Sequence, residues 1–147
     1  MLWRLIRSLF LLFVGAVAGF AAAAGVLRGA LTSRGDEGSD ELALVAIFNG
    51  IDLANRSTAF RGGSLLAWFG GIALDLRDAT LAPGARVEAR SLFGGVAIRV
   101  PTTWRVESAS YAFAGGVDAS TAAPDDPDAP TLVVDAVSVF GGISITN

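Results

Sequence analysis

The chain of 147 residues contains no cysteine, no histidine and no lysine. Without cysteine and histidine it has no disulfides, no thiolate nucleophiles, no imidazole bases and none of the usual zinc ligands. These absences exclude most familiar catalytic centres before any motif is considered. The remaining candidates, which are carboxylates and aromatic residues, have patterns that favour structural roles. We therefore expect no catalytic residue, no metal site and no cofactor.

Basic residues are scarce, and all 11 of them are arginines, against 14 acidic residues. Residues 35–147 contain every acidic side chain but only seven arginines, which gives this part a net charge of −7. A domain of that charge is not expected to bind nucleic acid. It also does not favour nonspecific adhesion to an anionic membrane surface.

The first residues hold the only long apolar run. Residues 8–27 carry no charge and are flanked by Arg4, Arg7 and Arg28. A helix of about 20 residues spans about 30 Å, the thickness of a bilayer core. We therefore predict one transmembrane helix at about 8–27 within an N-terminal membrane segment, residues 1–32, with the lipid bilayer as its partner.

A cleaved signal peptide is the alternative, with Ala22-Ala23-Ala24 as its cleavage site. The apolar run exceeds the 7–15 residues of a usual signal core, which favours the anchor. Arg4, Arg7 and the chain amine precede the run, and Arg28 and Arg34 follow it, so a bias of about one positive charge favours a domain outside the cytoplasm. Residues 33–41 are polar, charged and glycine-containing, so we expect an exposed linker before a domain at 42–147.

From residue 42 onward the apolar pattern has a period of two. Within residues 72–77, for example, isoleucine and leucine alternate with alanine, aspartate and arginine. This alternation is typical of strands, and Gly or Pro interrupts every long window that a helix would need. The pattern predicts an all-β domain with no helix after residue 41.

A phenylalanine followed by glycines recurs along this domain. The phenylalanines stand at 48, 69, 93, 113 and 140, at intervals of 21, 24, 20 and 27 residues. Self-similarity of that period predicts a stack of repeated coils. We expect about five coils that form either a short β-helix or a β-roll-like solenoid, and residues 60–63 (FRGG) are a partial copy that marks an irregular first coil.

Each Phe-Gly-Gly is expected to be a corner of one coil. Glycine there would adopt a φ that a Cβ disfavours, and would let coils lie about 4.8 Å apart. The phenylalanines would stack inside as a buried ladder. The last coil, residues 137–147, would leave an open edge that pairs with a partner or a second copy. The corner residues are Phe69, Gly70, Gly71, Phe93, Gly94, Gly95, Phe113, Gly115, Gly116, Phe140, Gly141 and Gly142.

Two sets of carboxylates are candidates for chemical sites. Asp125, Asp126 and Asp128 form the densest acidic cluster, but the stretch lacks the glycine-punctuated spacing of a calcium loop, so a solvated Pro-rich loop is favoured. Asp75 and Asp78 invite comparison with the carboxylate pair of glycosidases. Because Asp75 lies in the outward phase and Asp78 starts a turn, surface solvation or turn capping is the favoured interpretation.

Aromatic side chains outside the corners are the remaining candidates. Trp68, Trp104 and Tyr111 would be able to stack on sugar rings if they were exposed. Burial within a coil or at its rim is the favoured interpretation of the two tryptophans.

Residues 69–107, FGGIALDLRDATLAPGARVEARSLFGGVAIRVPTTWRVE, carry a recognisable order of motifs. A Phe-Gly-Gly corner is followed by DLRDA at 75–79, a second corner and VPTTWRV at 100–106. This order resembles the C-terminal domain of the cell wall-active antibiotic response proteins, the LiaF-like family, and the related toast-rack β-repeat domains. The resemblance covers about residues 44–147.

The resemblance implies a bacterial, membrane-associated β-solenoid-like domain without catalytic activity, and in one branch of that family such a domain restrains an envelope-stress sensor kinase. This chain differs in having one candidate membrane segment rather than several. We therefore expect a single-pass protein of the bacterial cell membrane that acts by protein contact in envelope-stress signalling or maintenance. The alternatives are a self-assembling scaffold, as in bactofilins, and a cell-wall polysaccharide binding module.

Overall fold

The computed structural model divides the chain into two compact units, Met1–Thr32 and Ser33–Asn147. The predicted membrane helix at 8–27, with its flanks Arg4, Arg7 and Arg28, lies largely outside the described residues. Among the residues that the structure describes, no helix has the length and apolar character needed to cross a membrane. Those residues are 11, 14–15, 18–19, 22–23 and 32–147.

The second unit is built from strands alone, which confirms the all-β prediction for residues 33–147. The ten strands are β1 (Glu41–Ile47), β2 (Gly50–Ala54), β3 (Phe60–Trp68), β4 (Gly71–Asp75), β5 (Leu81–Leu92), β6 (Gly95–Arg99), β7 (Arg105–Phe113), β8 (Gly116–Ser120), β9 (Thr131–Val139) and β10 (Gly142–Thr146).

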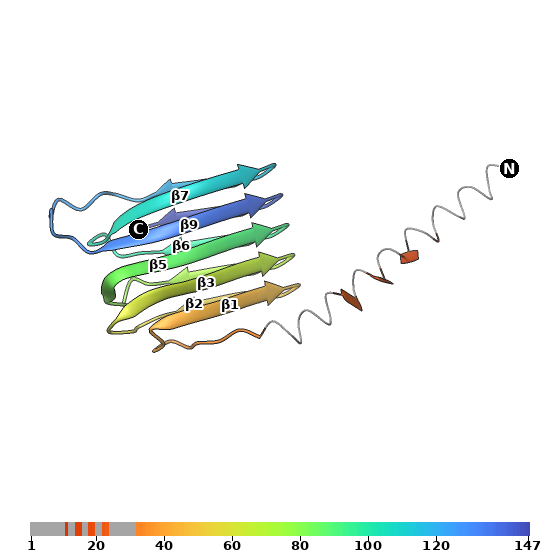
Figure 1. The fold of residues 1–147 in the computed structure, drawn as a ribbon, viewed down its shortest axis with the longest axis horizontal. Helices are drawn as coiled ribbons and strands as arrows, with labels where there is room; N and C mark the ends of the chain where they lie inside the picture. The colour runs from red at the N-terminus through yellow and green to blue at the C-terminus, as the bar shows by residue number, and fades with distance from the viewer. Residues whose placement is uncertain (1–10, 12–13, 16–17, 20–21, 24–31) are drawn as a thin grey trace. The chain divides into compact units, whose positions relative to one another are not determined.

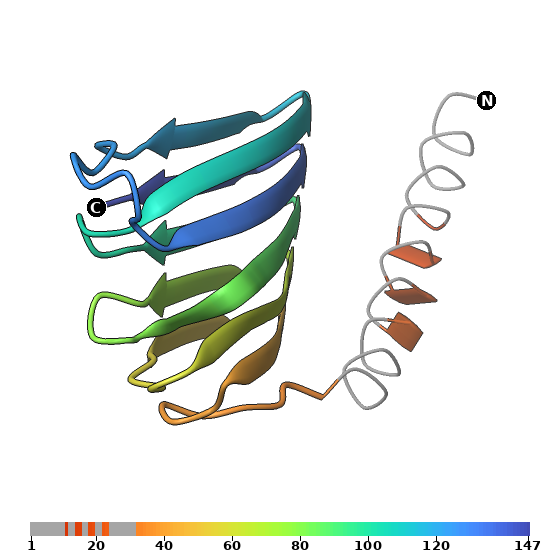
Figure 2. The same ribbon diagram turned by 60° about the vertical axis from the view of Figure 1, so that its left-hand side comes forward.

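The strands form two parallel sheets of five. The long, odd-numbered strands make one sheet in the order β1-β3-β5-β9-β7, and the short, even-numbered strands make the other in the order β2-β4-β6-β10-β8. Each long strand turns a corner into the short strand of the opposite layer (Figure 2). The five pairs, β1–β2 to β9–β10, are called coils 1 to 5 in chain order. The architecture is therefore a β-solenoid-like repeat, as the spacing of the phenylalanines predicted.

The core lies between the two sheets. Alternate side chains of every inner strand point into it, and the period-two pattern of the sequence is the cause. Leu74, Ile98 and Ile145, for example, follow one another across β4, β6 and β10 and are at most 1% exposed. At about 1.5–3 kcal/mol for each fully buried aliphatic side chain, this column is a main source of stability.

The coils are not stacked in chain order. Coil 5 lies between coil 3 and coil 4, because β9 pairs with both β5 and β7, and β10 pairs with both β6 and β8 (Figure 1). The expectation that residues 137–147 form the open end was therefore wrong. The open end is coil 4, residues 105–120. The long loop after β8 leads the chain back to the position between coils 3 and 4, where β9 and β10 form coil 5.

The inward side chains explain this order. Coil 5 presents Leu132 and Val134, both 0% exposed, from its long strand. The residues of β7 in the same register are Val106 and Ser108, and the next inward residue of β7 is Ser110. A serine hydroxyl without a partner is costly in the middle of an apolar core and harmless at its open end. Coil 4, whose core-facing residues include Ser108 and Ser110, therefore lies at the end. Coil 5, whose core-facing residues in β9 are apolar apart from the buried Ser138 next to the corner, fills the interior.

The partial copy at residues 60–63 lies in β3, within coil 2, so the expectation that it marks an irregular first coil was wrong. Phe60 begins β3, is fully buried, and is followed by a register shift against β5. Gly62 and Gly63 have φ values of 116° and 146°, and a Cβ on either would lie within 2 Å of a backbone oxygen of a neighbouring strand. The two glycines let β3 pass closely between β1 and β5.

The segment before β1 belongs to the folded unit rather than being a free linker. Arg34 and Ala43 form an antiparallel bridge with N···O distances of 2.6 and 2.8 Å. The hydroxyl of Ser33 accepts a hydrogen bond from the Val45 amide at 2.9 Å. Residues 33–34 therefore run antiparallel to β1 along its outer edge and pair with it at residues 43–45.

Candidate functional site

The five corners lie one above another at one end of the strands (Figure 1). In four of them the phenylalanine, not a glycine, adopts the left-handed conformation, with φ between 51° and 54°. The expected conformational role of the glycines was therefore wrong. The four residues are Phe48, Phe69, Phe93 and Phe140.

In coils 2 to 5 the first glycine of the corner is required by close approach of the neighbouring coil. A Cβ on Gly94 would lie 2.2 Å from the carbonyl oxygen of Gly70, and a Cβ on Gly141 would lie 2.4 Å from that of Gly94. The carbonyl oxygens involved accept hydrogen bonds from the second glycine of the next corner, as in Gly95 N to Gly70 O at 3.1 Å. The corners are thus joined by a continuous backbone ladder that has no space for side chains.

The phenylalanine rings form a continuous stack along this end of the solenoid. Ring centroids are 5.2 Å apart for Phe48 and Phe69, 4.8 Å for Phe69 and Phe93, and 5.0 Å for Phe93 and Phe140, with interplanar angles of 17° or less. We call these four rings the phenylalanine row. The predicted ladder exists, but its predicted position in the interior was wrong. Phe48, Phe93 and Phe140 are 51%, 46% and 49% exposed, because a corner side chain lies beyond the end of both sheets.

Coil 4 departs from this pattern by one residue. Its corner reads Phe-Ala-Gly-Gly, so Ala114 has the left-handed conformation and Phe113 is paired with Val139 at the end of the strand. The Phe113 ring meets Phe140 edge-on, with centroids 5.8 Å apart and an interplanar angle of 88°. Because Ala114 takes the place of the corner phenylalanine, the regular stack ends at Phe140, while Gly115 and Gly116 keep the corner positions of the other coils.

At Phe93, ring stacking stabilises the fold, whereas the left-handed backbone conformation destabilises it, and two substitutions can separate the two contributions. Phe93→Ala removes two stacked contacts of about 0.5–1.5 kcal/mol each and leaves a left-handed residue with a Cβ. Phe93→Gly removes the same contacts but relieves about 1 kcal/mol of backbone strain. We expect both variants to be destabilised, the alanine variant by about 1 kcal/mol more, in denaturant unfolding of the detergent-solubilised protein. Equal stabilities, or a less stable glycine variant, would contradict the assigned conformation.

A shallow groove of about 700 Å³ runs over the sheet of short strands, next to the corners. Its outward positions hold the second glycine of each corner, followed by small residues such as Ala73, Ala97 and Ser144. The sequence contains the relevant signal, because GGIALD, GGVAIR and GGISIT alternate small outward with large inward residues. The groove was not predicted, because the glycines were interpreted as corner residues only and not also as the floor of a groove.

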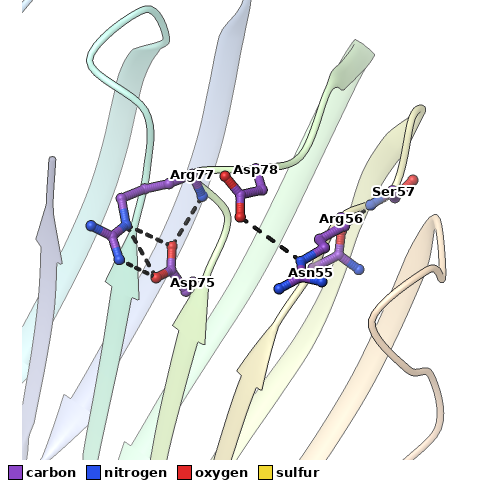
Figure 3. Close-up of polar contacts among 6 residues, drawn as sticks. All are labelled: Asn55, Arg56, Ser57, Asp75, Arg77 and Asp78. Carbon is purple, nitrogen blue, oxygen red and sulfur yellow. Dashed lines mark hydrogen bonds and ion pairs between the residues drawn. The ribbon is translucent and has the colours of Figure 1, made fainter.

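The opposite end of the strands is polar, and Figure 3 shows part of it. The Asp75 carboxylate accepts hydrogen bonds from the Arg77 amide at 3.1 Å and from the Arg77 guanidinium at 2.6–3.1 Å, while Arg56 and Asp78 form a longer ion pair of 3.8 Å. The side-chain hydrogen bond from Arg77 is the main cause that lowers the pKa of Asp75. An ionised, arginine-bound Asp75 closes its turn and does not have the raised pKa of a general acid.

The Asp75 interaction predicts a pH-dependent contribution to stability. Because its pKa is lower in the folded than in the unfolded chain, the contribution is present above pH 4 and is lost as the pH falls through the folded value. We expect Asp75→Asn to lower the free energy of unfolding by about 1 kcal/mol or less at pH 7, and by progressively less as the pH falls below about 4. Asp128→Asn, on the exposed loop, is the matched control. An Asp75→Asn effect that persists undiminished in acid would contradict this assignment.

The acidic loop and the remaining aromatics have structural positions. Asp125, Asp126 and Asp128 are exposed, and Asp126 accepts a hydrogen bond from the Asp128 amide at 2.9 Å, so it closes a turn. Within the described residues, no group of three or more carboxylates is placed to hold a metal ion. Trp104 is 3% exposed and Trp68 is half-buried. The Trp104 ring therefore offers no face to a sugar, and of the three only Tyr111 is largely exposed.

Comparisons of this chain with protein-family models, with curated proteins and with solved structures found no match. The functional argument therefore rests on the geometry of the coils and on the motifs of the sequence.

Proposed function

We propose that this protein is a membrane-anchored, non-enzymatic β-repeat protein that acts by protein contact, through the open edge of coil 4, in bacterial envelope-stress signalling or maintenance. One observation supports the open edge of coil 4 as the site of this contact. Over residues 32–147, no strand pairs with the outer edge of β7 or of β8. Such an edge presents backbone donors and acceptors on which an extended segment of a partner can add as a further strand.

The contrast with β1, the other edge strand of the same sheet, supports the outer edge of β7 as the contact site. Residues 33–34 pair with the outer edge of β1 at residues 43–45, as proteins commonly protect their edges. β7 is nine residues long, contains no proline, and has charges only at Arg105 and Glu107. Its inward hydroxyls, Ser108 and Ser110, lie at the exposed end of the core. A partner strand would meet hydrogen-bonding groups there rather than a bare apolar surface.

The signalling context comes from the sequence motifs. The order of corners and of the segments at 75–79 and 100–106 resembles the LiaF-like domains, which supports a membrane sensor kinase as the partner. The apolar run at 8–27 supports an anchor in the bacterial cell membrane, with the solenoid on the outer side.

A photoreactive benzoylphenylalanine at Tyr111 tests this proposal in cells that express the full chain. Tyr111 is on β7 and 63% exposed, so an aromatic probe replaces an aromatic side chain. We expect adducts with a membrane sensor kinase, identified by mass spectrometry, and none from a matched probe at Ala123 in the loop after β8. Adducts at neither position, or equally at both, would overturn the proposal.

Self-assembly is the second candidate, and the same open edge favours it. Two copies can pair through β7 because no like charges face each other when Ala109 lies on the two-fold axis of an antiparallel pair. Adducts between two copies at Tyr111, together with association that rises with concentration in analytical ultracentrifugation, would favour a scaffold over a kinase regulator.

A further inference from the structure

The two ends of the strands differ sharply in polarity. The five corners contain five phenylalanines and Trp68 and not one charged residue. The loops at the opposite end carry Arg56, Arg77, Asp78 and the three aspartates of the acidic loop. The corners are residues 47–50, 68–71, 92–95, 113–116 and 139–142. An exposed aromatic surface without charge is uncommon on a small domain and marks an interaction site.

The chain enters the solenoid at the same end. β1 runs toward the corner at Phe48, and the preceding segment runs antiparallel to it, with Ser33 bonded to Val45 and Arg34 to Ala43. Residue 33 is thus nearer the corners than residue 34. Only residues 28–32 separate Ser33 from the predicted apolar run, and a fully extended chain spans at most about 20 Å over that distance.

From these observations we infer that the corner end, led by the rings of Phe48, Phe93 and Phe140, lies against the lipid bilayer and inserts into its interface. This inference rests on the membrane anchor of the proposed function. A short tether holds the entry end of the domain within reach of the bilayer, and exposed aromatic rings partition into the boundary between headgroups and acyl chains. Charge favours the same orientation, because the acidic loop then lies at the far end from anionic headgroups.

The orientation has a consequence for partner binding. The strands then stand upright on the bilayer, and the stack of coils runs parallel to the membrane plane. The open edges of β7 and β8 therefore face sideways, toward other proteins of the same membrane, rather than away from it. A partner reaches this edge with a segment close to the bilayer surface.

The absence of cysteine allows a direct test with single labels. Phe93→Cys and Ala123→Cys are each labelled with the fluorophore NBD in the full-length protein, which is reconstituted into phosphatidylcholine vesicles. Both positions are exposed, one at the corner end and one at the opposite end. We expect nitroxide lipids labelled near the headgroup to quench the label at 93 at least about threefold more strongly than the label at 123. Aqueous iodide should quench in the reverse order.

Equal lipid quenching at the two positions overturns the inference. A label at 93 that is shielded from both iodide and lipid also overturns it, since a protein segment then covers the corners. Phe140→Cys provides a second corner label, and circular dichroism verifies the fold of each variant. Flotation of the unlabelled protein with vesicles after alkaline carbonate separates the two proposals. Protein that floats but shows no quenching at 93 or 140 contradicts only the orientation, whereas protein that does not float contradicts the anchor itself.

Discussion

Gly94→Ala is expected to destabilise the protein by at least about 3 kcal/mol, which is large for the addition of one methyl group. The new Cβ would lie 2.2 Å from the carbonyl oxygen of Gly70. That oxygen belongs to the backbone and accepts a hydrogen bond from Gly95, so no rotamer change can relieve the contact. Coils 2 and 3 would have to separate at the corner and lose this bond.

Gly95→Ala is the matched control in the same corner. Its Cβ would come no closer than 3.9 Å to the Gly142 oxygen, and neither Gly94 nor Gly95 has a positive φ. A Gly→Ala change at a compatible position is neutral or stabilising by up to about 1 kcal/mol, since it restricts the unfolded chain. In denaturant unfolding, Gly94→Ala should therefore strongly lower the free energy of unfolding, whereas Gly95→Ala should leave it unchanged or raise it slightly. Equal destabilisation would mean that the corner glycines act through conformational freedom and not through close approach.

Val134→Asp is expected to cost about 4 kcal/mol or more, whereas Ser108→Asp should change stability by less than about 0.5 kcal/mol. The two residues face each other in the same register of β9 and β7. Val134 is 0% exposed because coil 5 lies in the interior of the stack, and Ser108 is exposed because coil 4 is the end. A carboxylate in the interior would have to be protonated or would disrupt the coil.

This pair of variants distinguishes the observed coil order from a stack in chain order. In a stack in chain order, β7 would be an inner strand and β9 an end strand, so Ser108→Asp would be the damaging change. The thermal unfolding temperatures of both variants and of the unmodified protein, all solubilised in one detergent, provide the comparison. A larger effect at Ser108 than at Val134 would contradict the described fold.

The elements of this fold follow from short-range patterns in the sequence. Alternation in 72–77 and the spacing of the phenylalanines predict strands, corners and repeated coils, because strand periodicity is local. The same reasoning placed the Phe rings inside the stack. A corner residue has no sheet on either side, and that follows only from knowing that each coil consists of two strands and not three.

The order of the coils was missed although the sequence contains a signal for it. Ser108 and Ser110 occupy inward positions of β7, where the other long strands place leucine, valine, alanine or, in β3, glycine. Polar inward residues predict an end coil, and the ten residues between β8 and β9 are long enough to skip a neighbour. Asn49 is a similar signal for the other end coil. It occupies the position at which the later coils have their first glycine. A side chain is tolerated there because no corner precedes that of coil 1 in the stack.

The glycine groove and the open edge depend on assembly and were harder to foresee. Small outward residues at 73, 97 and 144 form a groove only once β4, β6 and β10 lie side by side. The outer edge of β7 is open only because β9 of coil 5 pairs with the inner edge of β7, between coils 3 and 4, and not with its outer edge. Both features follow from long-range pairing, which local periodicity does not determine.

Disulfide formation between paired cysteines tests the central claim, the stacking of Phe-Gly-Gly coils in the order 1-2-3-5-4, most directly. Ala97, Ser144 and Asp118 are aligned on the outward face of β6, β10 and β8. Adjacent strands place Cα atoms within about 5.5 Å, inside the disulfide range, whereas strands two apart are about 10 Å distant. In the otherwise cysteine-free chain, mild oxidation should link the pairs 97/144 and 118/144 and leave 97/118 reduced. Ready formation of the 97/118 disulfide, with 97/144 remaining reduced, would contradict the account.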